Sequence, residues 1–146
     1  MEADGLFVYD GLREGGRSHG WIQRTDPNGL TAAFAPGRLF HLPSSGYPAL
    51  VPIAEPDSAP PGPGWVAGEF IGYGDEHALN LALQDLDQLQ DVEGELFERR
   101  ILPVLLDSGH HYLAWVYVFP EDRLHRLEKE AIELEHGDWR DYLEDT

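Results

Sequence analysis

Cysteine is absent from the sequence, and Lys129 is its single lysine. A protein without cysteine has no disulfides, no thiolate nucleophile and no zinc site with cysteine ligands. Long apolar runs are lacking as well, because no stretch approaches the roughly 18 residues that cross a membrane. Residues 1–5 also lack the basic and apolar regions of a signal peptide. These absences predict a cytoplasmic protein that has no membrane partner.

Positive charge is scarce along the whole chain. Lys and Arg number 10 against 27 Asp and Glu, which gives a formal net charge of -17 at pH 7. Binding to nucleic acid relies on clustered Lys and Arg that neutralise phosphates. We therefore expect no nucleic-acid partner. The acidic residues are scattered and become denser toward the C-terminus, which is typical of a solvated surface.

Apolar and aromatic residues are plentiful enough for a globular core. The 146 residues are 42% hydrophobic and include 4 Trp, 6 Tyr and 6 Phe. This size and composition match one domain that folds without metal or disulfide staples. We predict a single domain over residues 1–146.

Short apolar segments bounded by Gly, Pro and Ser predict most of the secondary structure. Strands are expected at residues 6–9, 37–42, 47–52, 65–71, 97–106 and 112–119. The last two should form a hairpin that turns at Gly109 and His110. Residues 55–64 are rich in Pro, Gly and Ser and should form a mobile surface loop. Residues 137–140 indicate a turn that docks the ring of Trp139.

An amphipathic helix is predicted after Asp75, which is a good N-cap. Its leucines recur at the spacing of three and four residues that builds one buried stripe; they are Leu79, Leu83, Leu86 and Leu89. The helix should end near Gly94. Residues 121–134 also have a loosely helical spacing of apolar residues, so a further helix is expected there.

Two segments carry candidate chemistry, and each also has an ordinary structural explanation. Glycine in the loop at residues 9–13 allows backbone N–H groups to approach an anionic or carbonyl ligand, but plain turns have the same pattern. The acids at the end of the helix can supply a general acid or base, or can form a solvated helix end; they are Asp91, Glu93, Glu95 and Glu98. Arg99 and Arg100 can pair with these acids or bind a substrate carboxylate as a bidentate fork.

Metal and cofactor motifs are missing from the sequence. The 7 histidines have no spacing that places two of them on one helical face. No phosphate-binding or dinucleotide-binding glycine motif occurs, and no Gly-x-Ser-x-Gly elbow. The sequence therefore predicts neither a metal nor a cofactor.

A series of motifs extends in order along almost the whole chain. They are residues 7–13 (Phe-Val-Tyr-Asp-Gly-Leu-Arg) with Ser18-His19, residues 47–51 (Tyr-Pro-Ala-Leu-Val), Gly68-Glu69-Phe70, Leu86-Asp87, Phe97-Glu98-Arg99, residues 114–117 (Ala-Trp-Val-Tyr) and Gly137-Asp138-Trp139. In this order and spacing the chain resembles the γ-glutamylcyclotransferase-like family. Within that family it is similar to the γ-glutamylamine cyclotransferase type, in the small bacterial branch that ends in Gly-Asp-Trp.

The resemblance implies an α+β fold, a small mixed β-barrel with helices packed outside. It also implies a small-molecule γ-glutamyl substrate, held by the loop after the first strand largely through backbone groups. In the family, a glutamate after the Leu-Asp of the helix acts as general acid and base. The substrate's α-amine attacks its own γ-carbonyl, forms 5-oxoproline and releases an amine or amino acid, and no cofactor is needed.

Two positions depart from the family pattern. Asp10-Gly11 replaces Gly-Ser or Gly-Thr in the loop, which puts a carboxylate near the expected place of a substrate carboxylate. Gln90 stands where the family has its glutamate, and an amide cannot accept a proton at neutral pH. If the helix is about one turn longer, Glu93 reaches the same place, and Glu95 and Asp91 are the next candidates.

The resulting hypothesis assigns acid/base catalysis to Glu93. It assigns substrate binding to Tyr9, Asp10, Gly11, Leu12 and Tyr117. Two alternatives stay open at this point. Gln90 and Asp10 also fit a catalytically inactive γ-glutamyl-binding or regulatory module, and a scaffold whose cavity is filled by its own side chains is the third explanation.

Overall fold

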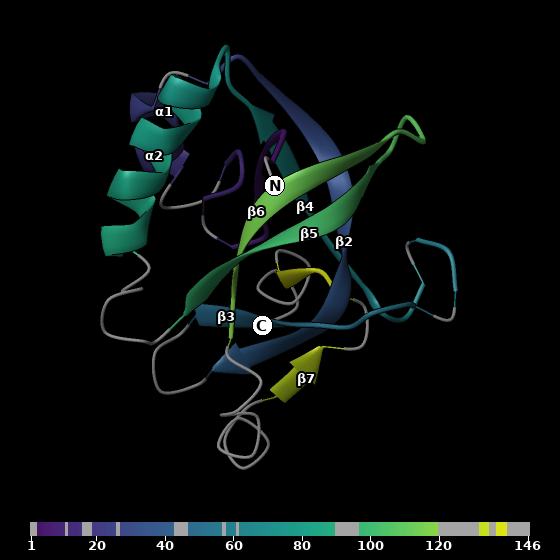
Figure 1. The fold of residues 1–146 in the computed structure, drawn as a ribbon. Coiled ribbons are helices and arrows are strands. Elements are labelled where there is room, and N and C mark those ends of the chain that lie inside the picture. The colour runs from purple at the N-terminus through teal and green to yellow at the C-terminus, as the bar shows by residue number, and fades with distance from the viewer. Residues whose placement is uncertain are drawn as a thin grey trace.

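Five strands close into a β-barrel in the part of the chain that the structure describes (Figure 1). The computed structural model describes residues 3–10, 12–15, 19–25, 27–42, 47–56, 58–60, 62–89, 97–119, 132–134 and 137–139. In chain order the elements are β1 (Gly5–Val8), α1 (His19–Arg24), β2 (Gly29–Leu42), β3 (Tyr47–Pro52), β4 (Trp65–Gly72), α2 (Glu76–Leu89), β5 (Glu98–Leu106), β6 (His111–Val118) and β7 (Ile132–Leu134).

Closure of the barrel depends on β2. The barrel strands follow the order β2, β4, β1, β6 and β5. β5 then returns to β2, where Ala33 pairs with Leu106 and Phe34 with Leu105. β1 and β6 run parallel, whereas the other barrel pairs are antiparallel. The α+β architecture with a small mixed barrel, implied by the resemblance, is confirmed.

β2 is longer than the sequence pattern predicted. A strand was expected at residues 37–42, and the observed strand begins at Gly29. Residues 29–36 pair with β4, and residues 37–42 pair with β3. β7 pairs with β2 on the other side of its second half. Because the first half is rich in alanine, which has little strand preference, its pattern in the sequence was weak.

The remaining predicted strands are confirmed, since β1, β3, β4, β5 and β6 overlap their expected segments. β5 and β6 form the expected antiparallel hairpin. Gly109 turns it with a φ of 94°, and its N–H donates to the carbonyl of Leu106 at 2.9 Å. The expected loop at residues 55–64 contains no helix or strand among its described residues.

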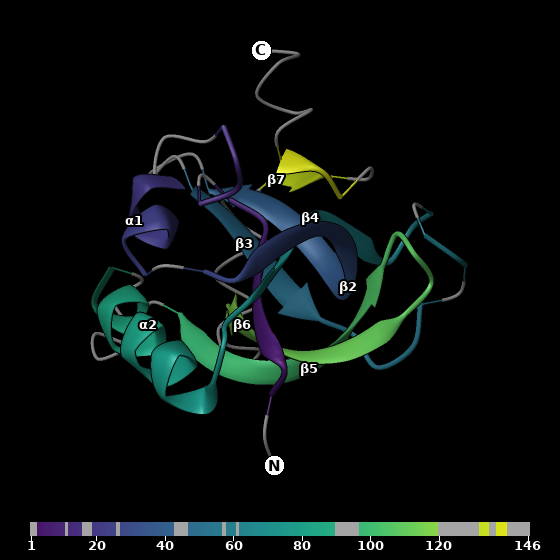
Figure 2. The same cartoon turned by 90° about the horizontal axis from the view of Figure 1, so that it is seen from above.

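Alternation along the strands produces two apolar clusters on opposite faces of the barrel wall. One cluster contains residues from both helices and therefore lies outside the barrel; it includes Leu6, Val8, Leu12, Ile22, Ile71, Leu79, Leu83, Leu86 and Tyr117. The other cluster contains no residue of α1 or α2 and fills the interior of the barrel; it includes Phe7, Tyr9, Leu39, Leu50, Val66, Val104, Val116, Val118 and Trp139. Both helices lie on the same side of the barrel (Figure 2).

The predicted N-cap and buried stripe of α2 are present. Asp75 Oδ1 accepts a hydrogen bond from the Ala78 N–H at 2.8 Å, which satisfies one of the free donors at the helix start. Leu79, Leu83 and Leu86 are buried against the barrel. The expected helix end near Gly94 falls within residues 90–96, which lie outside the described residues.

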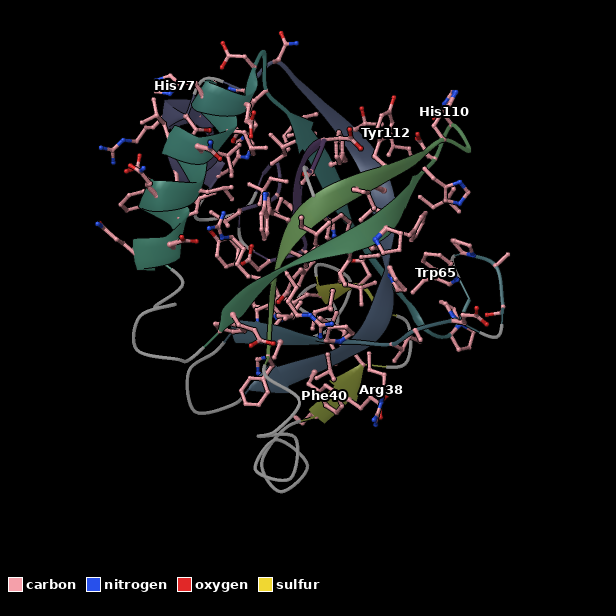
Figure 3. All side chains as sticks on the ribbon, in the orientation of Figure 1. Arg38, Phe40, Trp65, His77, His110 and Tyr112 are labelled. Carbon is pink, nitrogen blue, oxygen red and sulfur yellow. The ribbon has the colours of Figure 1, made fainter. Side chains whose placement is uncertain are left out.

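The helix expected at residues 121–134 is wrong at its C-terminal end. Residues 132–134 form β7, an antiparallel partner of β2 in which Leu134 pairs with Leu39. Arg38 of β2 secures this strand through two hydrogen bonds to Glu133, from Nε at 3.0 Å and from Nη2 at 2.8 Å. Arg38 also lies over the Phe40 ring beside β7 (Figure 3). Pairing with a strand more than 90 residues away overrides a weak local preference. Residues 120–131 lie outside the described residues.

Neither described helix has the length and apolar content needed to span a bilayer.

Candidate functional site

The hydroxyl of Tyr9 is held inside the barrel at the end of β1. It donates to the carbonyl of Tyr117 at 2.6 Å and accepts from the Leu50 N–H at 3.2 Å. Burial, followed by the nearby charge of Asp10, raises the pKa of this phenol well above its ordinary value. Tyr9 therefore joins β1, β3 and β6, and any contact with a ligand would use its backbone.

The loop that follows, residues 9–15, is called the first loop below. The backbone N–H groups of residues 12, 13 and 14 donate hydrogen bonds to other groups of the protein. The Leu12 N–H donates to Asp10 Oδ1 at 3.0 Å, and the Arg13 N–H donates to the Asp10 carbonyl at 3.1 Å. The Glu14 N–H donates to Glu69 Oε1 at 2.7 Å. Asp10 thus shapes the loop as an Asx turn, and Gly11 lies outside the described residues.

A partly buried ionic cluster anchors the first loop to distant segments. Glu69 of β4 is the one buried charged residue among those described, at 7% exposure. Arg13 lies between two carboxylates, with Nε 3.9 Å from Glu69 Oε2 and Nη1 3.1 Å from Asp138 Oδ1. The Gly-Glu-Phe and Gly-Asp-Trp motifs of the sequence therefore meet at this loop. Sequence reasoning recorded both motifs without finding their shared partner.

The segment at residues 137–139 is itself fixed against the barrel. Gly137 has a φ of 63°, and its carbonyl accepts from the Ala67 N–H of β4 at 2.8 Å. Trp139 is buried, and its Nε1 donates to His41 Nδ1 at 3.4 Å. The predicted docking of the Trp139 ring is confirmed.

A second group of polar side chains lies between α2 and the outer face of the barrel. The Tyr117 hydroxyl donates to Asp87 Oδ1 at 2.7 Å, and Arg99 Nε lies 3.2 Å from the same oxygen. The Arg99 guanidinium is 4.4 Å from the centre of the Trp115 ring. These four residues are called the Tyr117 network.

Electrostatics keep the Tyr117 hydroxyl protonated. Burial raises the pKa of Tyr117 most, and its hydrogen bond to the Asp87 carboxylate raises it further. A phenol that donates to a carboxylate retains lone pairs that can accept a hydrogen bond from a substrate N–H. The Tyr117 hydroxyl thus keeps the capacity to accept a hydrogen bond, and Asp87 fixes its orientation.

The first loop and the Tyr117 network lie at the same end of the barrel. β1 runs parallel to β6, so the end of β1 lies beside the end of β6, where Arg99 pairs with Tyr117. Leu12 and Tyr117 belong to the same outer apolar cluster. The structure therefore brings together Tyr9, Asp10, Leu12 and Tyr117 of the predicted binding set.

The predicted acid/base candidates are not part of the described site. Gln90, Asp91, Glu93 and Glu95 lie outside the described residues, and Glu98 is exposed at the start of β5. Arg99 pairs with Asp87, an acid that the sequence analysis had not considered as its partner. The signal was available, because Asp87 lies in the Leu-Asp motif one turn before Gln90.

Other places on the described surface offer less chemistry. A depression of about 160 Å³ is lined by Ala3, Asp4, Tyr73, Asp75, Glu76 and Leu79. It lies at the start of α2, about 16 Å along the helix from Asp87 at 1.5 Å per residue. No group of three metal-ligating side chains occurs among the described residues. His77 on α2 and His110 on the hairpin tip, for example, are far apart (Figure 3).

Comparison with protein families matches residues 6–141 to the family described as Gamma-glutamyl cyclotransferase, AIG2-like. Comparison with curated protein sequences finds no match.

Several solved structures share the fold. YkqA from Bacillus subtilis has a TM-score of 0.61 at 21% identity and covers 97% of this chain and 41% of its own. Allophanate hydrolase from Kluyveromyces lactis has a TM-score of 0.66 at 14% identity, covering 99% of this chain and 21% of its own. An AIG2-like protein from Mus musculus has a TM-score of 0.57 at 17% identity and covers 85% of this chain and 84% of its own. The chain thus spans less than half the length of the first two.

Proposed function

Because the chain belongs to the gamma-glutamyl cyclotransferase, AIG2-like family, we propose that it cyclises a γ-glutamyl amine or peptide to 5-oxoproline and releases the amine. One observation of the structure carries the proposal. The first loop and the Tyr117 network, which come from opposite parts of the sequence, are held together at one end of the barrel by Tyr9 and the outer apolar cluster. A small substrate that binds there would contact both.

The reaction suits a small protein that supplies position and one proton acceptor. The α-amine nitrogen of the substrate forms a bond to its own γ-carbonyl carbon, and the bond from that carbon to the leaving nitrogen breaks. The proton lost by the α-amine passes through the acid/base to the leaving amine, so the atoms balance without water. Holding the amine near the carbonyl supplies much of the rate, because the reaction is intramolecular.

In this proposal the substrate lies against Tyr9, Asp10, Gly11 and Leu12 of the first loop, and Tyr117 faces its amine. The Tyr117 hydroxyl donates to Asp87 and can accept a hydrogen bond from the substrate N–H. Asp10 shapes the loop through the Leu12 N–H and adds negative charge on the side where a protonated amine would arrive. Both features favour the α-ammonium group of a γ-glutamyl substrate.

Glu93 is the proposed acid/base. Gln90 follows the Leu-Asp motif at the family position and cannot take a proton, so another carboxylate must serve. Glu93 lies about one helical turn further along the chain than Gln90. Glu95 and Asp91 are the alternatives for the same role.

The test is the formation of 5-oxoproline from a panel of γ-glutamyl amines and dipeptides by the purified protein. Glu93→Gln should lower kcat by about 100-fold or more, which is the usual contribution of a positioned acid or base. Glu95→Gln and Asp91→Asn are matched controls, and each should retain most of the activity. If one of them loses activity instead, the acid/base role moves to that residue.

Gln90→Glu offers a complementary test. If the family position faces the substrate, this variant should keep or raise the activity and should restore turnover to Glu93→Gln. A protein that binds γ-glutamyl compounds without producing 5-oxoproline, with or without Gln90→Glu, would contradict the enzymatic proposal and support the binding module. The cytoplasmic location expected from the sequence belongs to the same proposal, and cell fractionation checks it.

A further inference from the structure

Arg99 has a guanidinium edge that no described residue uses. Its Nε faces Asp87 Oδ1 at 3.2 Å, and its Cζ lies over the Trp115 ring, 4.4 Å from the ring centre. No other described residue forms a hydrogen bond with Arg99. The two terminal nitrogens, Nη1 and Nη2, therefore remain as a pair of parallel donors, the geometry that binds one carboxylate at two points.

The side chain is also held in place before any ligand arrives. The side chains of Arg99 and Asp87 are each 27% exposed, so both are partly screened from water. Asp87 fixes one edge of the guanidinium, and the Trp115 ring supports its face. An arginine with few remaining rotamers loses less entropy when it binds an anion.

Arg99 lies on the side of the barrel where the substrate is proposed to bind. It pairs directly with Tyr117 across the β5–β6 ladder, so the two side chains share the outer face. β1, which leads into the first loop, is the next strand after β6. Two strand spacings separate β5 from β1, about 10 Å, a distance that a γ-glutamyl group folded for cyclisation can bridge with a hydrogen bond at each end.

Three described amides of the first loop are not available to bind a carboxylate. The amides at positions 12, 13 and 14 already donate to Asp10 and Glu69. The carboxylate of Asp10 also repels a second anion at the loop. A free α-carboxylate therefore needs a cationic donor elsewhere, because a desolvated carboxylate without a partner is costly.

We propose that Arg99 binds the α-carboxylate of the γ-glutamyl group through Nη1 and Nη2 and so restricts the protein to ligands with a free α-carboxylate. The inference rests on the proposed function. In this arrangement, different elements of the protein recognise the α-amine and the α-carboxylate of the γ-glutamyl group. The α-amine lies toward Tyr117 and Asp10, and the α-carboxylate lies toward β5.

The experiment compares two ligands that differ in one group, 5-oxoproline and its carboxamide, by calorimetric or NMR titration of the full chain. The wild-type protein should bind 5-oxoproline roughly 10- to 100-fold more tightly than the carboxamide, as expected for hydrogen bonds to a charged group. Arg99→Gln should remove this preference, and Arg99→Lys should keep only part of it. This comparison does not depend on turnover.

Arg100→Gln is the matched control. Arg100 is exposed on the neighbouring position of β5, so this variant loses the same charge and should keep the wild-type preference. Equal wild-type affinity for the two ligands, or no binding of either at millimolar concentration, would overturn the inference. Loss of the preference in Arg100→Gln as in Arg99→Gln would also overturn it, because total charge would then explain the effect. A protein that prefers 5-oxoproline yet forms none from any substrate would disprove the proposed reaction and support the role of Arg99.

Discussion

Arg13 in the first loop donates from Nη1 to Oδ1 of Asp138 at 3.1 Å, although the two residues are 125 positions apart in the sequence. The same arginine lies beside Glu69, whose carboxylate accepts from the Glu14 N–H. The shape of the first loop therefore depends on β4 and on residues 137–139 as well as on its own sequence. A loop fixed by partly buried charges is pre-organised for a ligand, since less ordering is left for the binding step.

Removal of the Asp138 carboxylate should weaken both the fold and the loop. Asp138→Ala takes away a charge-assisted hydrogen bond between two side chains that are 12% and 20% exposed. We expect the free energy of unfolding to fall by about 2 kcal/mol, measured by chemical denaturation. Asp85→Ala is the control, because Asp85 is exposed on α2, and its effect should stay within about 0.5 kcal/mol. Equal effects of the two substitutions would show that the Arg13 contact contributes nothing.

Gly137 should tolerate no side chain. Its φ is 63°, and a Cβ added there would collide with the Trp65 carbonyl oxygen. Gly137→Ala should therefore lower the free energy of unfolding by about 2 kcal/mol or more through backbone strain and displacement of β4.

The control for that substitution is Gly20→Ala in α1, where an added Cβ meets nothing within 4 Å. Alanine also favours helix over glycine, so this variant should be as stable as the wild-type protein or slightly more stable. Thermal unfolding of the two variants side by side makes the comparison. A Gly137→Ala variant with wild-type stability would contradict the explanation that the first residue of the Gly-Asp-Trp motif must be glycine because of its φ and its contact with β4.

Most strands could be predicted from the sequence because they are locally encoded, whereas the barrel was implied by the family resemblance. β6 is a continuous apolar and aromatic run, and α2 has an N-cap and leucines spaced three and four residues apart. Each element can therefore be recognised from a window of about ten residues. β7 and the first half of β2 cannot, because their stability comes from partners elsewhere in the chain. The residues around Leu134 give no local indication of its pairing with Leu39.

The arrangement of the candidate site was predicted in part for the same reason. Tyr9, Leu12 and Tyr117 were singled out through their motifs, and the structure places them at one end of the barrel. The link between Asp87 and Arg99, and the link between Arg13 and Asp138, are contacts between separate elements. Charge alone could not reveal them, since an acidic chain offers each arginine many possible partners.

Two buried phenols should make the fold unstable at alkaline pH. Burial raises the pKa of Tyr9 and of Tyr117 well above their ordinary value, which is about 10 in an unfolded chain. Above about pH 10 the unfolded state releases protons that the folded state keeps, so the unfolded state is favoured as pH rises. Each phenol should then cost about 1.4 kcal/mol of stability per pH unit.

Denaturation curves collected between pH 8 and pH 11.5 would measure this slope. Stability should show no contribution from the two tyrosines below about pH 9 and should decline steeply above about pH 10. Tyr117→Phe should reduce the slope of stability against pH by the contribution of one phenol, about 1.4 kcal/mol per pH unit. An unchanged slope in Tyr117→Phe would mean that this hydroxyl titrates in the folded protein as it does in the unfolded chain.

Net charge should make stability depend on salt. With 27 acidic and 10 basic residues the formal net charge is -17, and folding concentrates this charge on one small surface, where it repels itself. Salt also weakens the favourable ion pairs, but the described pairs are few, and the pairs of Arg13 are partly buried and screened less. Repulsion should therefore dominate, and the melting temperature should rise as NaCl increases from 20 mM to 0.5 M. KCl should have the same effect if the cause is screening, whereas a melting temperature that stays constant or falls would show that the acidic residues are spaced widely enough to avoid one another.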